Sequence, residues 1–299
     1  DYLSLDAVPD YPNALNGLQV AGEREVARVA VAVDATLASI EAAVAGKADL
    51  LLVHHGLFWD GNRPVTGRRY RRLKALLDAG VALYAAHLPL DAHGEVGNNV
   101  VLAKELGIEV RGRFAAHEGV DLGVWGDLSV SREALCARLD ETLGGHVKLI
   151  PGGPERIRRV GVVTGGGGSF VAAAIAEGLD ALVTGEGSHH TYFDATEGGL
   201  NLYYGGHYAT EVWGVRALAR HLEERFGLSM QARRTAVSIP SNVAEGFRRW
   251  RRQAYCNHVS IALGSQGELE TQLEIAIRLK FVTPLRAAST FKRIEEVGC

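Results

Sequence analysis

Three short segments of the chain each follow an apolar stretch with side chains that bind metal ions. The first contains the adjacent pair His54 and His55, the second runs from His87 to Asp91, and the third contains His207 and Glu211. Any one of these histidines alone is better explained by a hydrogen bond in a protein core. Together they offer the mixed imidazole and carboxylate ligands that suit zinc, iron, manganese, nickel or cobalt. The sequence therefore predicts a site for two divalent transition metal ions.

The elements around these segments are those of an α/β protein. Short apolar stretches alternate with helix-like stretches, which predicts a three-layer α/β/α domain with a mixed six-stranded sheet. The predicted strands are residues 29–34, 50–54, 81–86, 159–164, 181–184 and 202–204. Ligands of open α/β sheets bind beyond the carboxyl ends of the strands. The second, third and sixth strands end at the three segments, so we expect their side chains to meet at one edge of the sheet.

Local spacing supports this convergence. His207 and Glu211 are four residues apart, so they share one face of a helix if the segment begins one. His54 and His55 would point to opposite faces of a regular strand, and they can share a site only where the strand ends. Gly56 permits the necessary turn. Two adjacent imidazoles that do not easily serve one ion are well placed for two neighbouring ions.

The chain also contains a predicted insertion and a helical tail. Residues 112–155 hold a strand (123–128), a helix (132–143, with Ser131 as its N-cap) and a second strand (146–150), which predicts an inserted small α+β domain. The α/β domain then consists of residues 1–111 and 156–228. From residue 229 strand signals stop, and an all-α C-terminal segment is expected over 229–299. Its predicted helices begin at Ser241, span 253–280 and span 285–297.

Composition excludes several classes of protein. The chain has 32 basic and 35 acidic residues, which does not suggest a polyanion or a membrane surface as a partner. The N-terminus has no basic flank with an apolar signal core, and no apolar run approaches the ~18 residues that cross a bilayer. We therefore expect a cytoplasmic protein. Cys136, Cys256 and Cys299 are far apart and are expected to be reduced thiols.

Five motifs resemble one known family. They are residues 16–20, 54–59, 87–93 with 97–99, 184–190 and 206–211, which read NGLQV, HHGLFW, HLPLDAH with GNN, TGEGSHH and GHYATE. Over about residues 1–228 the chain resembles the dinuclear metal centre hexameric protein family, also called Nif-three-like or GTP cyclohydrolase I type II-like. The resemblance implies a homohexamer of two stacked three-fold rings. It also implies five metal ligands, which are His54, His55, Asp91, His207 and Glu211.

Two metal ions ~3.5–4 Å apart can activate water and stabilise an anionic oxygen, which is the chemistry of metal-assisted hydrolysis. Glu211 or Asp91 is the natural bridging carboxylate. His87 and His190 are candidates for proton transfer, or equally for structural hydrogen bonds. Asn98 and Asn99 are candidates to bind substrate, or to cap a helix that begins at residue 100.

Four consecutive glycines, residues 165–168, follow the fourth predicted strand. Backbone amides at such a place can hold a phosphate. The run lacks the Lys-Ser/Thr of a P-loop and the spacing of a dinucleotide fingerprint, so a tight strand-to-helix turn is the preferred interpretation.

The tail resembles a second family. Residues 231–247, 261–265 and 268–273, which read QARRTAVSIPSNVAEGF, IALGS and ELETQL, are similar to the four-helix bundle proteins encoded by intervening sequences of large-subunit ribosomal RNA genes. The resemblance covers about residues 227–299 and lacks the long first helix of that family, so a partial bundle with an interaction role is expected. Arg248, Arg249, Arg251 and Arg252 suggest either RNA binding or a solvated helix face, and a nucleic-acid partner is not expected.

Two functions are compatible with the predicted site. The first is a metal-dependent hydrolase of the GTP cyclohydrolase-like kind, acting on a nucleotide or a phosphorylated small molecule. The alternative is a non-enzymatic ring that stores, delivers or senses metal.

Overall fold

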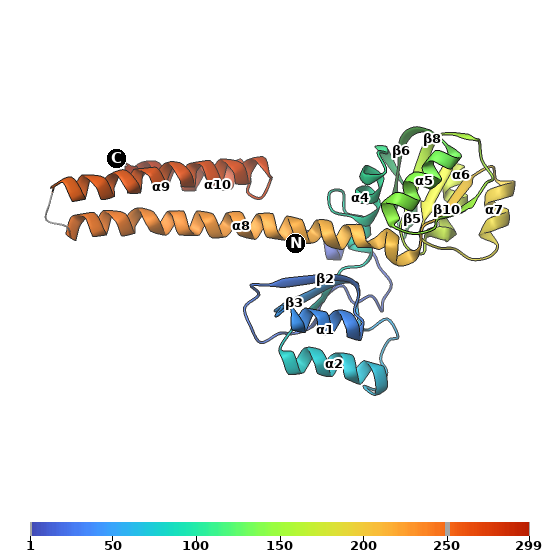
Figure 1. The fold of residues 1–299 in the computed structure, drawn as a ribbon, viewed down its shortest axis with the longest axis horizontal. Helices are drawn as coiled ribbons and strands as arrows, with labels where there is room; N and C mark the ends of the chain where they lie inside the picture. The colour runs from blue at the N-terminus through green and yellow to red at the C-terminus, as the bar shows by residue number, and fades with distance from the viewer. Residues whose placement is uncertain (1, 249–251, 299) are drawn as a thin grey trace. The chain divides into compact units, whose positions relative to one another are not determined.

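The computed structural model describes residues 2–248 and 252–298. The chain divides into two compact units, Asp1–Ala219 and Arg220–Cys299 (Figure 1). The first unit contains all ten strands, and the second contains only helices. No helix in the described ranges is both long and apolar enough to cross a membrane.

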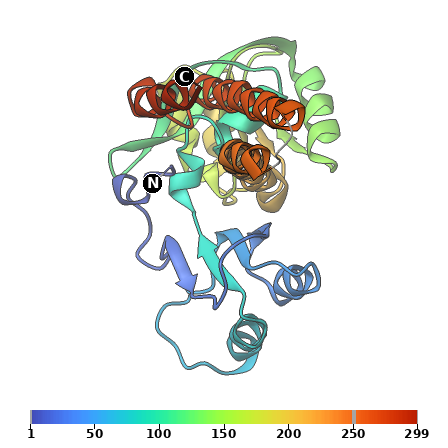
Figure 2. The same cartoon turned by 90° about the vertical axis from the view of Figure 1, so that its left-hand side faces the viewer.

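A four-stranded sheet is formed by the N-terminal part of the first unit, with the strand order β1-β4-β3-β2. β2 (Val29–Asp34), β3 (Leu50–His55) and β4 (Ala82–Ala85) are parallel, and β1 (Gly17–Val20) pairs antiparallel with β4. The short 3-10 helix η1 (Leu5–Ala7) precedes it. Two helices, α1 (Leu37–Ala45) and α2 (Gly67–Ala79), lie next to each other and pack against the sheet through Ile40 and Leu76 (Figure 2).

A six-stranded sheet follows, with the order β5-β6-β8-β9-β10-β7. Its strands are β5 (Glu109–His117), β6 (Val120–Ser131), β7 (Lys148–Ile150), β8 (Arg156–Val163), β9 (Ala181–Thr184) and β10 (Asn201–Tyr204). β8, β9 and β10 are parallel, whereas β6 and β7 pair antiparallel with β8 and β10. This sheet therefore is mixed.

Helices cover both faces of the six-stranded sheet. α4 (Asn98–Glu105) and α5 (Arg132–Leu143) pack on one face through a core that includes Leu102 and Leu135. α6 (Val171–Ala176) and α7 (Thr191–Glu197) pack on the other through Ala174 and Ala195. Ser131 caps α5 as predicted, since its hydroxyl accepts a bond from the amide of Ala134 at 3.1 Å.

The predicted α/β class, with mixed sheets and an all-helical C-terminal segment, is confirmed. One feature differs, because the six predicted strands do not share one sheet. The strands at 29–34, 50–54 and 81–86 belong to the four-stranded sheet, and the strands of the predicted insertion 112–155 pair into the second sheet. Hydrophobic periodicity identifies a strand but does not identify its partner, which depends on contacts between distant residues.

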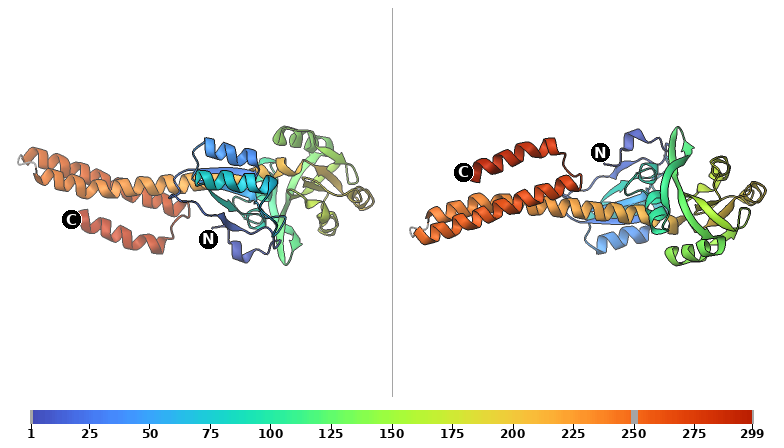
Figure 3. Two further views of the ribbon diagram at one scale, coloured as in Figure 1. Left: turned by 90° about the horizontal axis from the view of Figure 1, so that it is seen from below. Right: turned by 90° about the horizontal axis from the view of Figure 1, so that it is seen from above.

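The second unit consists of the latter part of α8 (His207–Arg248) with α9 (Arg252–Arg278) and α10 (Pro284–Gly298) (Figure 3). Its core joins Ile239 of α8, Leu269 of α9 and Ile294 of α10. The predicted helix start at Ser241 is wrong, because α8 runs through Pro240 without ending.

A proline inside a helix removes one backbone hydrogen bond. The carbonyl that loses its donor is that of Ala236, four residues before Pro240. The side chains just after the proline donate to the next carbonyls of the helix, Ser241 to Val237 and Asn242 to Ser238. Of the arginines considered for RNA binding, Arg248 and Arg252 are exposed. Arg249 and Arg251 lie outside the described residues, as does Cys299, while Cys136 and Cys256 are free thiols.

Candidate metal centre

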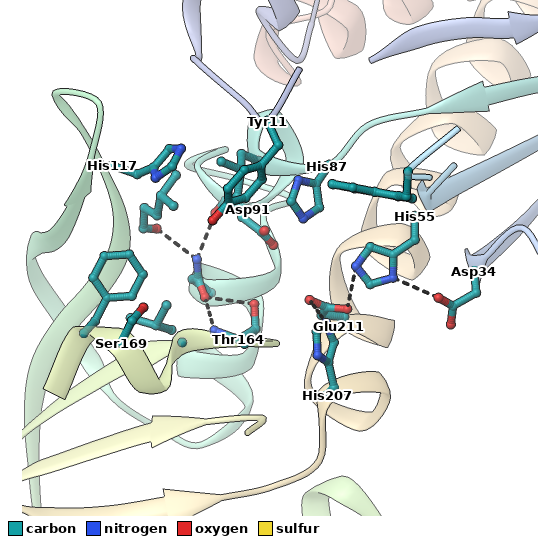
Figure 4. A pocket seen from close by; sticks show the side chains of 18 residues that line it. Tyr11, Asp34, His55, His87, Asp91, His117, Thr164, Ser169, His207 and Glu211 are labelled. Carbon is teal, nitrogen blue, oxygen red and sulfur yellow. Dashed lines mark hydrogen bonds and ion pairs between the residues drawn. The ribbon is translucent and has the colours of Figure 1, made fainter. Parts of the chain in front are cut away.

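The three ligand-bearing segments meet in the first unit, at strand ends of both sheets. His54 and His55 end β3, and His87 precedes the short helix α3 (Leu88–Asp91), which follows β4. His207 begins α8, just after β10, and Glu211 lies one turn further along the helix. His55, His87, Asp91, His207 and Glu211 line a cavity of about 700 Å³, and the side chain of His54 is fully buried beside it. The predicted convergence is therefore present in the structure (Figure 4).

Every histidine of the cluster has its Nδ1 atom fixed by an oxygen. Nδ1 of His54 donates to the carbonyl of Ala86 at 2.9 Å. The other three donate to carboxylates, His55 to Asp34, His87 to Asp10 and His207 to Glu186, at 2.8 to 2.9 Å. These bonds place the proton of the neutral ring on Nδ1 and leave the Nε2 lone pair available. Metal-binding histidines are held in this way.

Glu211 is surrounded by three of these Nε2 atoms, of which those of His55 and His207 are seen in Figure 4. Its Oε1 is 3.5 Å from His54 Nε2 and 3.2 Å from His207 Nε2, and its Oε2 is 3.4 Å from His55 Nε2. These distances are at or beyond the long end for N–H···O bonds. They are close to the ~3.4 Å that separates two ligands of a tetrahedral ion bound at ~2.1 Å.

Buried atoms without partners point to the same conclusion. In the described part of the chain, His54 Nε2 and Glu211 Oε2 are buried and make no hydrogen bond. A buried polar atom without a partner costs about 1–3 kcal/mol. Metal ions between these atoms would satisfy them, so the residues fit a metal centre. Two overlapping groups have ligand atoms close enough for an ion: His54 with His55 and His87, and His55 with His207 and Glu211.

The charges of the metal-free cluster are strongly coupled. The hydrogen bond that Glu211 accepts from His207 raises the pKa of His207 to about 9, against an opposing effect of burial. Burial opposes protonation of His54 too, but the carboxylates of Asp91 and Glu211 outweigh it and raise the pKa of that ring. Burial would raise the pKa of Glu211, yet His207 and His54 hold it well below its usual range. An ion bound here would take the place of protons on the rings.

Asp91 completes the predicted ligand set. Its Oδ2 atom is 3.5 Å from His54 Nε2, and its Oδ1 accepts a 2.8 Å bond from Asn98 Nδ2. Asn98 and Asn99 were predicted either to bind substrate or to cap a helix that begins at residue 100. Neither caps α4, whose N-cap is Gly97.

Both asparagines are instead buried bridges between elements. Asn98 accepts a bond from the Gly214 amide at 2.6 Å, which ties Asp91 to α8. Asn99 donates to the carbonyls of Asp91 and Leu122 and accepts from the amide of Thr164 at 2.7 Å. Their side chains are hydrogen-bonded within the protein, and Asn99 also lines the cavity, so substrate binding by either residue stays a prediction. Local cap rules could not predict partners that lie 65 and 116 positions away.

His190 does not join the cluster. It is exposed at the start of α7 and is not among the residues that line the cavity. The predicted proton-transfer role of His190 therefore has no geometric support, whereas His87 faces the cavity. Sequence reasoning also missed the carboxylates that fix the rings, Asp10, Asp34 and Glu186. Of these, Asp34 ends a predicted strand and Glu186 lies in the quoted motif 184–190, whereas Asp10 lies in none of the predicted strands or quoted motifs.

The wall of the cavity opposite the metal ligands is partly aromatic. Tyr11, His117 and Phe170 line it with Ser169 (Figure 4). The rings of Tyr11 and His117 are 5.2 Å apart between centroids. Trp59 also lines the cavity, with its ring centroid 4.7 Å from that of His87. The cavity thus combines a candidate metal centre with several aromatic side chains.

The glycine run is explained by close packing. Gly165 has a φ of +65°, and a Cβ atom placed on it would collide with Glu211 Oε1. Gly167 and Gly168 continue into the 3-10 helix η2 (Gly167–Phe170), where added Cβ atoms would meet Thr184 and Gly187. The preferred interpretation of a tight strand-to-helix turn agrees with this geometry.

Comparison with known families gives two matches. The model of the Duf34/NIF3 (NGG1p interacting factor 3) family matches residues 5–241, and that of the 23S rRNA-intervening sequence protein matches residues 207–299. The second range begins earlier than the resemblance suggested, and α8 supplies a long helix there.

Relatives and solved structures agree with the first match. A Deinococcus radiodurans protein named GTP cyclohydrolase 1 type 2 homolog is 43% identical over 77% of this chain and 88% of its own. A Halobacterium salinarum protein of the same name is 48% identical over 71% and 86%. The crystal structure of TTHA1606 from Thermus thermophilus is 42% identical, with a TM-score of 0.69 over 76% of this chain and 90% of that one.

Proposed function

This chain belongs to the Duf34/NIF3 family, and we propose that it is a metal-dependent hydrolase that binds two divalent transition metal ions and acts on a nucleotide or another phosphorylated small molecule. The observation that carries the proposal is the buried Glu211 carboxylate with three Nε2 atoms 3.2 to 3.5 Å away. The name of the relatives, GTP cyclohydrolase 1 type 2 homolog, supports the substrate class.

In this proposal the metal ligands are five side chains of the cluster. His54, His55, Asp91, His207 and Glu211 would hold the metals, and Glu211 would be the carboxylate common to both because its two oxygens face different rings. This favours Glu211 over Asp91, whose Oδ1 is engaged by Asn98. When bound, the metals would lower the pKa of water toward neutrality and withdraw charge from the group attacked.

His87 is the candidate for proton transfer. Its Nδ1 atom donates to Asp10, so its Nε2 atom is free to take or give a proton at the cavity. Burial alone would raise the pKa of Asp10, but the bond from His87 helps to lower it, and the carboxylate therefore stays charged and keeps the ring oriented. The aromatic wall is available to stack a planar part of the substrate.

The proposal predicts metal-dependent turnover. Full-length protein loaded separately with zinc, manganese or iron is expected to hydrolyse at least one member of a panel of nucleoside triphosphates and phosphate esters, as followed by chromatography of the products. A chelator should abolish turnover and added metal should restore it. Metal-replete protein that is inert across the panel would contradict the hydrolase, and rapid exchange of its metal would then favour storage, delivery or sensing.

A further inference from the structure

A second pocket adjoins the metal cavity. Its volume is about 210 Å³, and it shares the side chains of Asp34, His55 and Trp59 with the larger cavity. The remaining walls come mainly from α2, which contributes three arginines, and from the residues just before α1. The arginines are Arg68, Arg69 and Arg72. The pocket therefore lies directly beside the metal centre, with His55 common to both.

The pocket has an excess of positive charge. Its carboxylates are already engaged, since Asp60 forms an ion pair with Arg69 at 3.5 Å and Asp34 accepts the bond from His55. Arg68 and Arg72 have no ion-pair partner among the residues that the structure describes. Two cations four residues apart on one helix repel each other and destabilise the helix. An anionic ligand between them would remove that repulsion.

The N-terminus of α1 adds to this preference for anions. Thr36, its N-cap, lines the pocket. The side chain and amide of Thr36 are occupied by the capping box with Ser39, but the positive end of the helix dipole still faces this side. Guanidinium groups bind phosphate oxygens in pairs of parallel hydrogen bonds. The charge and the donors of the pocket therefore match a phosphate group.

We infer that this pocket binds the terminal phosphate or diphosphate of the substrate, with Arg68 and Arg72 as the contacting side chains, while the reacting part of the same molecule lies at the metal centre. The part of this inference that places the reacting group at the metal centre rests on the proposed function. A small phosphorylated molecule fits better than a nucleic acid, because the pocket is small and shares three lining residues with the metal cavity, and the chain as a whole carries a formal charge of -3.

The test compares charge-removing variants on one helix. Metal-loaded full-length protein is titrated with inorganic diphosphate in a calorimeter, and metal content is measured in every sample. Arg68→Gln and Arg72→Gln are each expected to weaken binding by about tenfold or more, because each removes a charge-assisted contact. Arg71→Gln is the matched control, since Arg71 is exposed on the same helix and does not line the pocket. Its affinity should stay within about twofold, the range of screened surface charges.

Three outcomes overturn the inference: equal affinities in all three variants, a loss in Arg71→Gln as large as in Arg72→Gln, or a dependence on Arg68 and Arg72 that appears with a single-stranded RNA oligonucleotide but not with diphosphate. The two proposals fail separately. Diphosphate binding through Arg68 and Arg72 without any turnover would support the phosphate pocket and contradict the hydrolase. Turnover with an unchanged KM in the Arg68→Gln/Arg72→Gln double variant would support the hydrolase and contradict the phosphate pocket.

Discussion

Replacing Glu211 with glutamine is expected to reduce the metal content of the protein by at least one ion per chain and its turnover by more than about 100-fold. Changing a group that only orients a metal ligand already costs about 10–100-fold in metal affinity or activity. Glu211 faces three imidazoles and is only 3% exposed, so its charge is central to the cluster. Glutamine keeps the size of the side chain and removes the charge that balances the cations.

Elemental analysis and a turnover assay on the same preparation check this expectation. Glu223→Gln is the control, because Glu223 lies on the same helix and is exposed. The control should retain metal and activity. A Glu211→Gln protein that binds as much metal as the control, at the same affinity, would show that Glu211 is not a ligand.

Replacing Gly165 with alanine is expected to damage the metal centre without touching a ligand. The Cβ atom of alanine would collide with Glu211 Oε1, and the φ of +65° at this position is strained for any residue with a side chain. A left-handed conformation costs a non-glycine residue about 1–3 kcal/mol. We expect a loss of that size in the free energy of unfolding, together with a loss of metal through displacement of the Glu211 carboxylate.

Gly166→Ala serves as the matched control in the same glycine run. The φ of Gly166 is −80°, and an added Cβ would lie 3.8 Å from the nearest atom, Cε1 of His207, which is ordinary van der Waals contact. Denaturant unfolding and metal titration of the two variants separate the effects. If Gly165→Ala and Gly166→Ala bind metal equally well, the close approach of Gly165 to Glu211 has no role in the site.

The sequence alone predicted that the ligand-bearing residues converge, although not how. Ligands bind beyond the carboxyl ends of strands in α/β proteins, and helix periodicity places residues four apart on one face. These two rules brought together His54, His55, His87, Asp91, His207 and Glu211, and the structure places all of them at one site. The strand ends that meet here belong to two sheets and not to one edge of a single sheet. The hexamer and the number and identity of the metals stay predictions.

What the sequence could not predict depends on contacts between distant residues. Asp10 orients His87 from 77 positions away, and Asn98 reaches Gly214 across 116. The division of the strands between two sheets likewise depends on contacts between distant residues. His190 was selected because of its place in a motif, and only the fold shows that it lies outside the cavity. Pro240 misled for another reason, since local rules would end a helix at a proline, whereas α8 continues past it and packs through Ile239 against α9 and α10.

Metal content per chain is the most direct measurement of the proposed centre. Full-length protein purified without added metal, and the same protein after incubation with zinc, manganese or iron and removal of the excess, should be analysed for all transition metals. We expect two divalent ions per chain in the loaded protein, retained on gel filtration and lost in Glu211→Gln. A chain that retains no metal under either condition would contradict the metal centre and the hydrolase built on it.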